Sequence, residues 1–370
     1  MTWFLNPAVR RDDIFRGLFT DDEYRDVRDY AERHYQTEIS STPLARLDTI
    51  ARNCGIASIL AKDETHRQGI NAFKITGVSY AVERIGVGVA RRGLVCATAG
   101  NHGRAVARVA REKGVACTVF LPVARTLDPI EQGTRNARVD AMQQDGATVI
   151  EVAGTYEEAV ARAATFGAEE GATVVSDTSW NGYEQIPRWI MAGYTRIFEE
   201  ASHQWEARPD LVVVQGGVGG LVCAAASWFA ARYGAERPFI VAAEPERAAC
   251  LLESARIGSP ATLTGSLDTI MAGLRCAEPS PLAWPVIAGG VDAFVTVSDA
   301  SAIDTMLMLT DGTERERIEA GPSGACGLAA LRDMALAPGL SPLRSVLHAG
   351  RPLIDTHSRA LVVITEGSGR

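Results

Sequence analysis

A single lysine, Lys74, stands in the run "NAFKITGVSY" of small, aromatic and hydroxyl side chains at residues 71–80. Lysine is almost never fully buried without a partner, so a solvated surface position is its ordinary interpretation. If Lys74 is buried instead, the neighbouring Ala72 and Phe73 would lower its pKa and favour the neutral, nucleophilic amine. Lys74 is therefore the first candidate for covalent chemistry.

Two glycine-rich turns follow apolar runs of the chain. "LVCATAGNHG" places Gly100, Asn101 and His102 at the start of a predicted helix, and "LVVVQGGVGG" places the glycines of 216–220 before another. Backbone N–H groups in such turns, together with the partial positive charge of a helix N-terminus, bind phosphate groups. Neither turn continues into a Walker loop or a dinucleotide fingerprint. Taken alone, the second turn is weak evidence for a phosphate site, because such turns more often serve tight packing.

These turns belong to a chain in which apolar, β-branched runs alternate with alanine-rich amphipathic stretches. The runs predicted as strands are "GLVCATA", "ACTVFLP", "ATVIEV", "ATVVSD", "DLVVVQGG", "PFIVAAEP", "AFVTVS" and "ALVVITEG". The alternation predicts an α/β fold with mostly parallel, twisted sheets and helices on both faces. Ligands of such sheets bind at the carboxyl ends of the strands, where both turns lie.

The composition narrows the choice of partners. A length of 370 residues suggests two domains, and 46% hydrophobic with 22% charged residues is typical of a globular protein. The net charge of −8 argues against nucleic acid or an anionic membrane as partner. The N-terminal residues lack the apolar core of a signal peptide, and no segment is apolar enough to span a membrane, so we expect a cytoplasmic protein.

Seven scattered cysteines show no spacing typical of a metal site, and we expect no metal. Free thiols are the default for a cytosolic chain. Cys250 and Cys276 bracket a polar stretch and are the pair that could form a disulfide, as the minority outcome.

Together these motifs resemble the fold-type II pyridoxal-phosphate enzymes, which include serine and threonine dehydratases, cysteine synthase and tryptophan synthase β. Within that group the chain is most similar to the diaminopropionate ammonia-lyases. The resemblance runs from about Thr42 to Gly367 and rests on "INAFKITGVSYAV", "TAGNHGRAVA", "VVSDTSWNGYEQIPRWIMAGY", "TIMAGLRCAEPSPLAW", "GPSGA" and "ITEG". It implies a two-domain fold in which residues 94–166 form a small α/β domain inserted between residues 1–93 and 167–370, and, by analogy, a homodimer.

The resemblance also implies a set of site residues. Lys74 would be the Schiff-base lysine, and Asp177 would hold and protonate an amine leaving from the β-carbon of the substrate. The residues expected around the cofactor are Lys74, Phe73, Asn101, Gly216, Gly217, Val218, Gly219, Gly220 and Thr365, with Asn101 on the phenolic oxygen and Thr365 facing the pyridine nitrogen. Those expected around the substrate are Thr98, Ala99, Gly100, Asn101, His102 and Tyr183. A packing role for His102 and a wall position for Tyr183 remain open.

One position departs from the family. Diaminopropionate ammonia-lyases typically have an aspartate before GNHG, where it accepts the α-proton of the D-isomer, and this chain has Ala99. Alanine accepts no proton. We therefore expect Lys74 to be the base and the substrates to be L-amino acids.

The predicted activity is elimination of ammonia from L-2,3-diaminopropionate, or a related β-substituted L-amino acid, to give pyruvate and ammonia. A β-replacement enzyme and an L-serine or L-threonine dehydratase are alternatives that share the aminoacrylate intermediate. A protein that binds the cofactor or an amino acid without catalysis is the alternative from another class.

Overall fold

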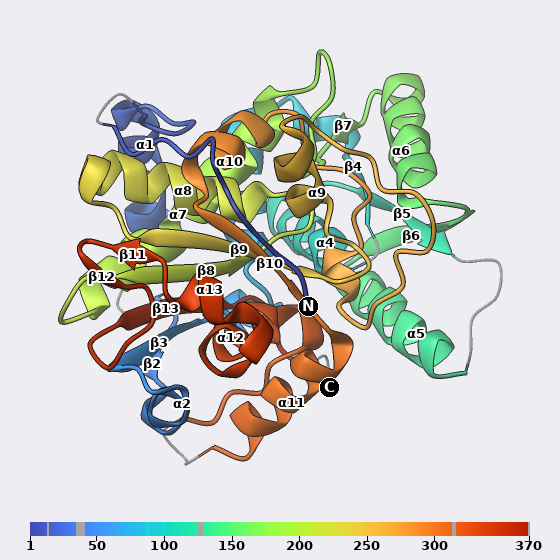
Figure 1. Ribbon diagram of the computed structural model, residues 1–370. Helices are drawn as coiled ribbons and strands as arrows, with labels where there is room; N and C mark the ends of the chain where they lie inside the picture. The colour runs from blue at the N-terminus through green and yellow to red at the C-terminus, as the bar shows by residue number, and fades with distance from the viewer. Residues whose placement is uncertain are drawn as a thin grey trace.

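The largest sheet of the described chain has seven strands in the order β1-β10-β9-β8-β13-β3-β2 (Figure 1). The computed structural model describes residues 1–12, 15–34, 41–86, 88–98, 100–123, 129–312 and 316–368, with backbone alone for 129–135. The strands of the larger sheet are β1 (Trp3–Leu5), β2 (Leu44–Arg46), β3 (Ser58–Asp63), β8 (Leu211–Gln215), β9 (Phe239–Pro245), β10 (Ala293–Val297) and β13 (Arg359–Ile364). Its interior strands are parallel, and only the edges β1 and β2 pair antiparallel with their neighbours.

A four-stranded parallel sheet, β6-β5-β4-β7, stands beside it and comprises β4 (Leu94–Ala97), β5 (Cys117–Val123), β6 (Ala147–Ala153) and β7 (Thr173–Val174). A short hairpin joins β11 (Leu347–His348) to β12 (Arg351–Pro352). Each predicted strand overlaps an observed one. The mostly parallel α/β fold is confirmed, whereas the division at residues 94 and 166 stays a prediction, and β7 adds residues beyond 166 to the smaller sheet.

Helices cover both faces of the larger sheet. Their bounds are α1 (Asp21–His34), α2 (Asp48–Cys54), α3 (Lys74–Ile85), α4 (Asn101–Lys113), α5 (Pro129–Gln144), α6 (Tyr156–Glu170), α7 (Gln185–Gln204), α8 (Gly220–Tyr233), α9 (Cys250–Ile257), α10 (Trp284–Gly290), α11 (Asp299–Thr310), α12 (Pro322–Leu336) and α13 (Ser341–Arg344). Along β8, Val212 and Val214 pack with α7 and α8, while Leu211 and Val213 pack with α12. Successive side chains of a strand point to opposite faces, so a continuous apolar run is buried on both.

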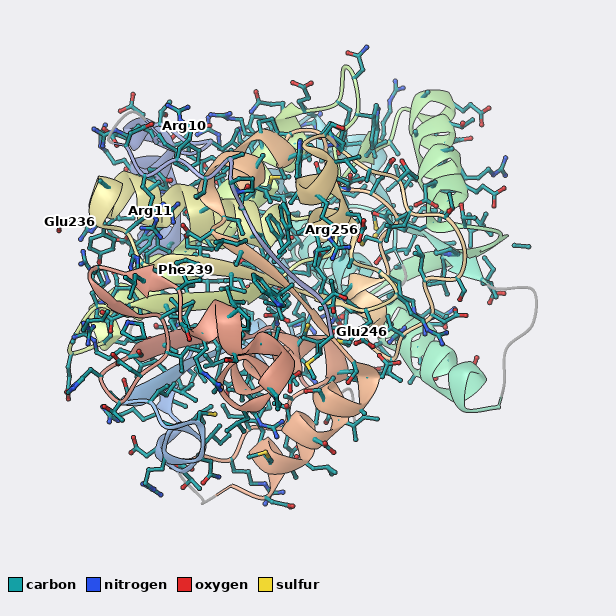
Figure 2. All side chains as sticks on the ribbon, viewed as in Figure 1. Arg10, Arg11, Glu236, Phe239, Glu246 and Arg256 are labelled. Atoms are coloured by element: carbon teal, nitrogen blue, oxygen red, sulfur yellow. The ribbon has the colours of Figure 1, made fainter. Side chains whose placement is uncertain are left out.

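The N-terminal residues are held to the edge of this sheet. Strand β1 pairs with β10, and the Asp292 carboxylate accepts hydrogen bonds from Arg11 Nε at 2.9 Å and Arg237 Nη1 at 2.7 Å. The Arg11 guanidinium also lies over the Phe239 ring, 5.8 Å from its centroid (Figure 2). No helix of the described chain has the length and apolar character that a membrane span needs.

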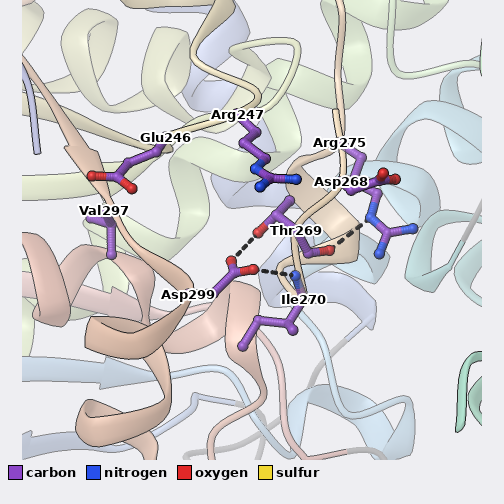
Figure 3. A pocket seen from close by; sticks show the side chains of 8 residues that line it. All are labelled: Glu246, Arg247, Asp268, Thr269, Ile270, Arg275, Val297 and Asp299. Atoms are coloured by element: carbon purple, nitrogen blue, oxygen red, sulfur yellow. Dashed lines mark hydrogen bonds between the residues drawn. The ribbon is translucent and has the colours of Figure 1, made fainter. Parts of the chain in front are cut away.

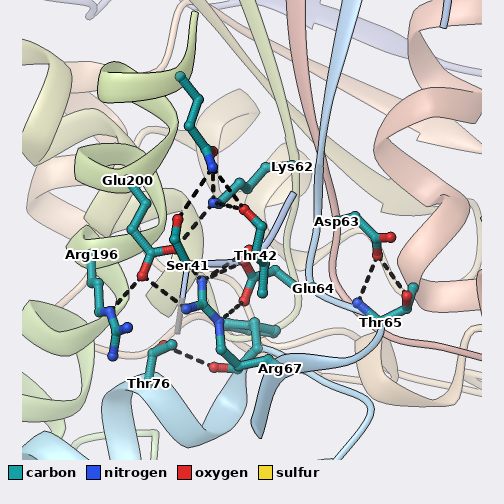
Figure 4. A network of polar contacts seen from close by, with 12 residues as sticks. Ser41, Thr42, Lys62, Asp63, Glu64, Thr65, Arg67, Thr76, Arg196 and Glu200 are labelled. Carbon is teal, nitrogen blue, oxygen red and sulfur yellow. Dashed lines mark hydrogen bonds and ion pairs between the residues drawn. The ribbon is translucent and has the colours of Figure 1, made fainter. Parts of the chain in front are cut away.

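A buried network of charges connects β3 to α7 (Figure 4). The side chains of Lys62, Glu64 and Arg67 are fully buried. Arg67 donates to both Glu64 and Glu200 at 2.7 and 2.8 Å, and Lys62 lies 3.1 Å from Glu200. Because breaking a buried ion pair leaves an uncompensated charge, this network fixes the segment that leads toward Lys74.

Helix α3 begins at Lys74 and packs tightly on α7. A Cβ at Gly77 would lie 2.5 Å from the Ile190 carbonyl oxygen, and one at Gly193 would lie 2.6 Å from that of Thr76. Only glycine permits so close an approach of two helix backbones. The contact fixes the position of the first turn of α3, which carries Lys74, relative to α7.

Candidate active site

A cavity opens where the chain leaves β8 and β13 and enters α3, α4 and α8. The residues that line it are Phe73, Lys74, Thr98, Gly100, Asn101, His102, Tyr156, Asp177, Gln215, Gly216, Gly217, Val218, Gly219, Gly220, Leu221, Ala272, Gly273, Leu274, Arg275, Cys276, Ser323, Thr365 and Glu366. The structure thus gathers the predicted site residues, apart from two. Tyr183 does not line the cavity, and Ala99 lies outside the described residues.

Local pairing brings Lys74 to the end of β13. Ala72 forms a β-bridge with Glu366, the Phe73 N–H donates to the Thr365 carbonyl oxygen at 3.1 Å, and the Gly367 N–H donates to Asn71 at 2.9 Å. Asn71 has a positive φ of 59°, a left-handed conformation that asparagine adopts more readily than most residues. The turn before α3 is therefore attached directly to the segment after β13.

Lys74 and Asp177 form an ion pair inside the cavity. The distance from Lys74 Nζ to Asp177 Oδ2 is 2.6 Å, and the two side chains are 21% and 12% exposed. Burial alone would lower the pKa of Lys74, but the Asp177 carboxylate outweighs it and raises this pKa above its usual range. Burial would raise the pKa of Asp177, and Lys74 holds it well below its usual range. The lowered lysine pKa expected beside apolar groups and a bound cationic cofactor stays a prediction; in the protein alone, the Asp177 carboxylate, a residue distant in sequence, reverses the direction of the shift.

The aromatic surroundings expected of Lys74 are present. Its ammonium lies 5.1 Å from the Phe73 ring centroid and 5.6 Å from that of Tyr194. The Tyr194 hydroxyl is buried and has no hydrogen-bond partner among the described residues. These rings exclude water from one side of the amine.

His102 and Tyr156 flank Asp177. His102 Nε2 donates to the Val175 carbonyl oxygen at 2.8 Å, and its Nδ1 lies 3.9 Å from Asp177 Oδ2. Burial lowers the pKa of His102, so the ring is neutral near pH 7 and carries its proton on Nε2. The Tyr156 hydroxyl is 3.5 Å from Asp177 Oδ1. The histidine thus packs against the strand end and presents an unprotonated nitrogen to the ion pair.

Tyr183, predicted near the substrate, instead supports the turn that carries Asp177. Its hydroxyl accepts from the Ser176 N–H and donates to the Val174 carbonyl oxygen, each at 2.9 Å, and its ring stacks on Trp180. The hydroxyl therefore substitutes for backbone pairing where β7 ends. This places Tyr183 behind Asp177 rather than in the cavity.

The glycine turn of 216–220 forms the opposite wall. A Cβ at Gly216 would lie 2.5 Å from Leu251 Cδ1, and one at Gly217 would lie 2.9 Å from Cys276 Sγ. Gly219 has a positive φ of 94° and precedes α8 without any side-chain hydrogen bond to the helix N-terminus. Uncapped N–H groups at the start of a helix and a backbone free of side chains form a cradle that fits a phosphate dianion.

The cysteines near this turn are free thiols. Cys250 Sγ lies 3.5 Å from the Gly217 carbonyl oxygen and donates to it, while Cys276 lines the cavity. The default interpretation of the cysteines is confirmed for the pair that could have formed a disulfide.

The far end of the cavity contains polar groups that the sequence did not single out. Gln215 Nε2 donates to Thr365 Oγ1 at 2.7 Å, so the orientation of this hydroxyl is fixed. The Asn101 side-chain amide donates to the Glu366 carboxylate, which also accepts from the Ser323 N–H at 3.1 Å. The adjacency of Glu366 to Thr365 in "ITEG" was the available signal for Glu366. Gln215 is the last residue of β8, directly before the glycine turn, and this position was the available signal that it lines the cavity.

Helix α4 connects Asn101 to the segment before Lys74. Arg104 and Arg108 donate to the carbonyl oxygens of Ile70 and Gln68, at 3.1 and 3.3 Å, and both bind the buried Asp145 carboxylate. The amide of Asn101 and the amine of Lys74 are thereby held relative to each other. A lysine amine, a glycine-lined phosphate cradle and a fixed hydroxyl match the aldehyde, phosphate and ring nitrogen of pyridoxal phosphate.

Known proteins resemble this chain over most of its length. A family model described as "Pyridoxal-phosphate dependent enzyme" matches residues 35–349. Diaminopropionate ammonia-lyase of Escherichia coli (strain K12) is 31% identical over 88% of this chain and 84% of its own length. The Salmonella typhimurium protein of that name is 32% identical over 88% and 85%.

A solved structure shows the same arrangement in three dimensions. It is diaminopropionate ammonia lyase from Escherichia coli in complex with an aminoacrylate-PLP azomethine reaction intermediate, which matches with a TM-score of 0.87 at 29% identity. The match covers 100% of this chain and 94% of that one. Sequence, fold and the lysine-bearing cavity therefore agree, and this chain belongs to the family of pyridoxal-phosphate dependent enzymes.

Proposed function

We propose that the protein is a pyridoxal-phosphate-dependent ammonia-lyase that eliminates ammonia from L-2,3-diaminopropionate, or a related β-substituted L-amino acid, to give pyruvate and ammonia. The observation that carries this proposal is the contact of Lys74 with Asp177 within the cavity. β-Elimination of ammonia requires a base for the α-proton and a group that keeps the leaving amine protonated, and the ionised Asp177 carboxylate can hold it as an ammonium. The similarity to diaminopropionate ammonia-lyases over most of the chain supports the choice of substrate.

The glycine turn and the groups opposite it would hold the cofactor. The glycine turn of 216–220 would bind its phosphate through the N–H groups of residues 217–220, which include that of Val218, because the Gly216 N–H donates to the Ala243 carbonyl oxygen. Asn101 would bind the phenolic oxygen, Thr365 would face the ring nitrogen, and Phe73 would pack beside the ring. Because Gln215 already donates to Thr365, that hydroxyl is oriented toward the cavity as a donor. When bound, pyridoxal phosphate supplies an electron sink for the negative charge left on the α-carbon.

Lys74 and Asp177 would divide the proton transfers between them. Lys74 takes the α-proton of the L-isomer once its nitrogen is neutral. Asp177, released from its ion pair, then holds the β-ammonium group of the substrate, which leaves as ammonia only if it departs protonated. Thr98, Gly100, Asn101 and His102 lie on the side of the cavity where a substrate carboxylate would bind to backbone amides.

Larger-scale properties complete the proposal. Residues 94–166 act as a small domain that closes over the substrate and excludes water from the carbanion. The protein works in the cytoplasm as a homodimer, which light scattering on the purified protein would test. Ala99 restricts the enzyme to L-isomers.

The test is a spectrum followed by an assay. The purified protein should show a yellow absorbance band that is lost in Lys74→Ala, and it should release 2-oxo acid from L-2,3-diaminopropionate without an added nucleophile. Release from L-serine or L-threonine alone would identify a dehydratase, and a requirement for a nucleophile would identify a β-replacement enzyme. Cofactor binding without turnover of any of these amino acids would identify a non-catalytic binding protein.

A further inference from the structure

A second cavity adjoins the candidate active site on the side of α6. Its volume is about 320 Å³, and Tyr156, Val218 and Cys276 line both cavities. We call it the vestibule; its other lining residues are Glu157, Val160, Ala161, Ala164, Thr178, Ser179, Trp180, Ala277 and Glu278. Since the Tyr156 hydroxyl lies 3.5 Å from the Asp177 carboxylate, the inner end of the vestibule leads to the residue proposed to receive the leaving amine.

The vestibule has a charge of one sign. Glu157 and Glu278 are its charged residues, and none of the described residues that line it is a lysine or an arginine. Both glutamates are exposed, and Glu278 is positioned by a hydrogen bond of 2.9 Å from the Thr262 hydroxyl. The Glu157 carboxylate also acts on the inner wall: burial raises the pKa of Cys276 to about 12, and Asp177 and Glu157 contribute to the rise. The rest of the wall is mainly alanine, valine and tryptophan, and these side chains offer no opposite charge to Glu157 and Glu278.

A third cavity, which also adjoins the active site, differs in its charges (Figure 3). It has a volume of about 420 Å³, shares Arg275 with the active site, and is lined by Arg247 as well. Its carboxylates have partners: Asp299 accepts from the Thr269 hydroxyl and the Ile270 N–H, and Glu246 binds the N-terminal ammonium. Its two arginines and the N-terminal ammonium that Glu246 binds balance its three carboxylates, Glu246, Asp268 and Asp299, so this cavity has no preference for a cation.

We propose that the vestibule is the route by which the amino acid enters, and that Glu157 and Glu278 are specificity-determining residues that favour substrates with a cationic side chain. The inference rests on the proposed function. Protonated 2,3-diaminopropionate carries a net positive charge, whereas serine and threonine are neutral zwitterions. A cleft with charges of one sign and apolar walls concentrates the oppositely charged ligand and accelerates its association.

Charge-neutral variants test the carboxylates. Glu157→Gln and Glu278→Gln should each lower kcat/KM for L-2,3-diaminopropionate by about three-fold at low salt, and the double variant by about ten-fold, with the loss vanishing at about 0.5 M salt. L-Serine turnover should change little. Glu169→Gln is the matched control, because Glu169 is an exposed carboxylate of the same helix that does not line the vestibule. An equal loss for both amino acids, or no loss, would overturn the assignment of the two glutamates.

A blocking variant tests the route. Ala161→Trp, at an exposed position that lines the vestibule, should lower kcat/KM about ten-fold for every amino acid and leave the absorbance of the bound cofactor unchanged. Unchanged turnover would show that substrate enters elsewhere.

The two proposals can fail separately. If wild-type protein turns over L-serine but not diaminopropionate, the proposed function is wrong. The vestibule is then tested by diaminopropionate as an inhibitor of serine turnover. Its inhibition constant should rise about ten-fold in the double variant, and an unchanged constant would overturn the inference.

Discussion

Replacement of Asp177 by asparagine tests the ion pair on which the proposed chemistry depends. At a separation of 2.6 Å, two unit charges attract by about 6 kcal/mol in an effective dielectric constant of about 20. Burial of both groups cancels part of this attraction. We therefore expect Asp177→Asn to lower the free energy of unfolding of the cofactor-free protein by about 3 kcal/mol, near the lower end of the cost of breaking a buried pair.

The assay is urea unfolding, followed by tryptophan fluorescence, of wild type, Asp177→Asn, Lys74→Met and the double variant. The cycle should give a coupling free energy of about 3 kcal/mol. The pKa of Lys74 is raised, so its contribution is present below about pH 10.4, the unfolded value, and is lost as the pH rises through the folded pKa. The pKa of Asp177 is lowered, so its contribution is present above about pH 3.9 and is lost as the pH falls through the folded pKa.

The coupling should therefore be constant between about pH 5 and pH 9. A coupling below about 1 kcal/mol, which is typical of exposed pairs, would refute the argument that the pair is desolvated. A coupling that varies across this range would show that one partner is not ionised. In the loaded enzyme, Asp177→Asn should lower kcat for diaminopropionate about 100- to 1,000-fold, since the leaving amine loses the carboxylate that keeps it protonated.

Three further changes probe other parts of the site. Gly219→Ala should lower the free energy of unfolding by about 2–3 kcal/mol and weaken cofactor binding, because its Cβ would overlap Ile287 and its φ is positive. Gly258→Ala is the control: it has open space at a φ of 76°, so it should cost about 1 kcal/mol and leave cofactor binding unchanged. Thermal melts and cofactor titrations would measure both effects. Burial raises the pKa of Glu244 to about 8, so this side chain retains its proton in the folded protein at neutral pH. The free energy of unfolding of the wild type should therefore fall as the pH rises from 4.5 to about 8. Glu244→Gln should remove this pH dependence, as denaturation at several pH values would show. With Ala99 in place of a carboxylate, kcat/KM should favour L- over D-diaminopropionate by at least about 100-fold, and comparable turnover of the isomers would contradict the assignment of Lys74 as sole base.

The parallel core was predictable because its signal is local. Runs such as "LVVVQ" and "FIVAA" are buried on both faces, and their continuous apolar character identifies them without knowledge of their neighbours. Strand β3 gave no such signal, since "SILAKD" contains Lys62 and leads into Glu64 and Arg67. Those charges are buried only because they meet Glu200 on α7, and one sequence does not show that contact.

In the candidate site, too, local features were predictable and contacts between distant segments were not. Motif order identified Lys74, Asn101, the glycine turn and Thr365, all of which line one cavity. The order of motifs could not predict contacts between segments that are distant in sequence. The raised pKa of Lys74 depends on the contact with Asp177, and the position of Tyr183 depends on backbone groups left unpaired where β7 stops.

The order of strands has a consequence for how the protein is made. β13 lies in the middle of the larger sheet, between β8 and β3, yet it follows every other strand of the described chain in sequence, and Arg359 pairs with Ser58, about 300 residues earlier. Until β13 is made, the sides of β3 and β8 that face it have no partner strand, and exposed strand edges are prone to aggregation. Because Thr365 and Glu366 follow β13 directly and line the cofactor cavity, the cavity cannot be complete before β13 has joined the sheet. A chain truncated before β13 would lack both the middle of its larger sheet and part of its site.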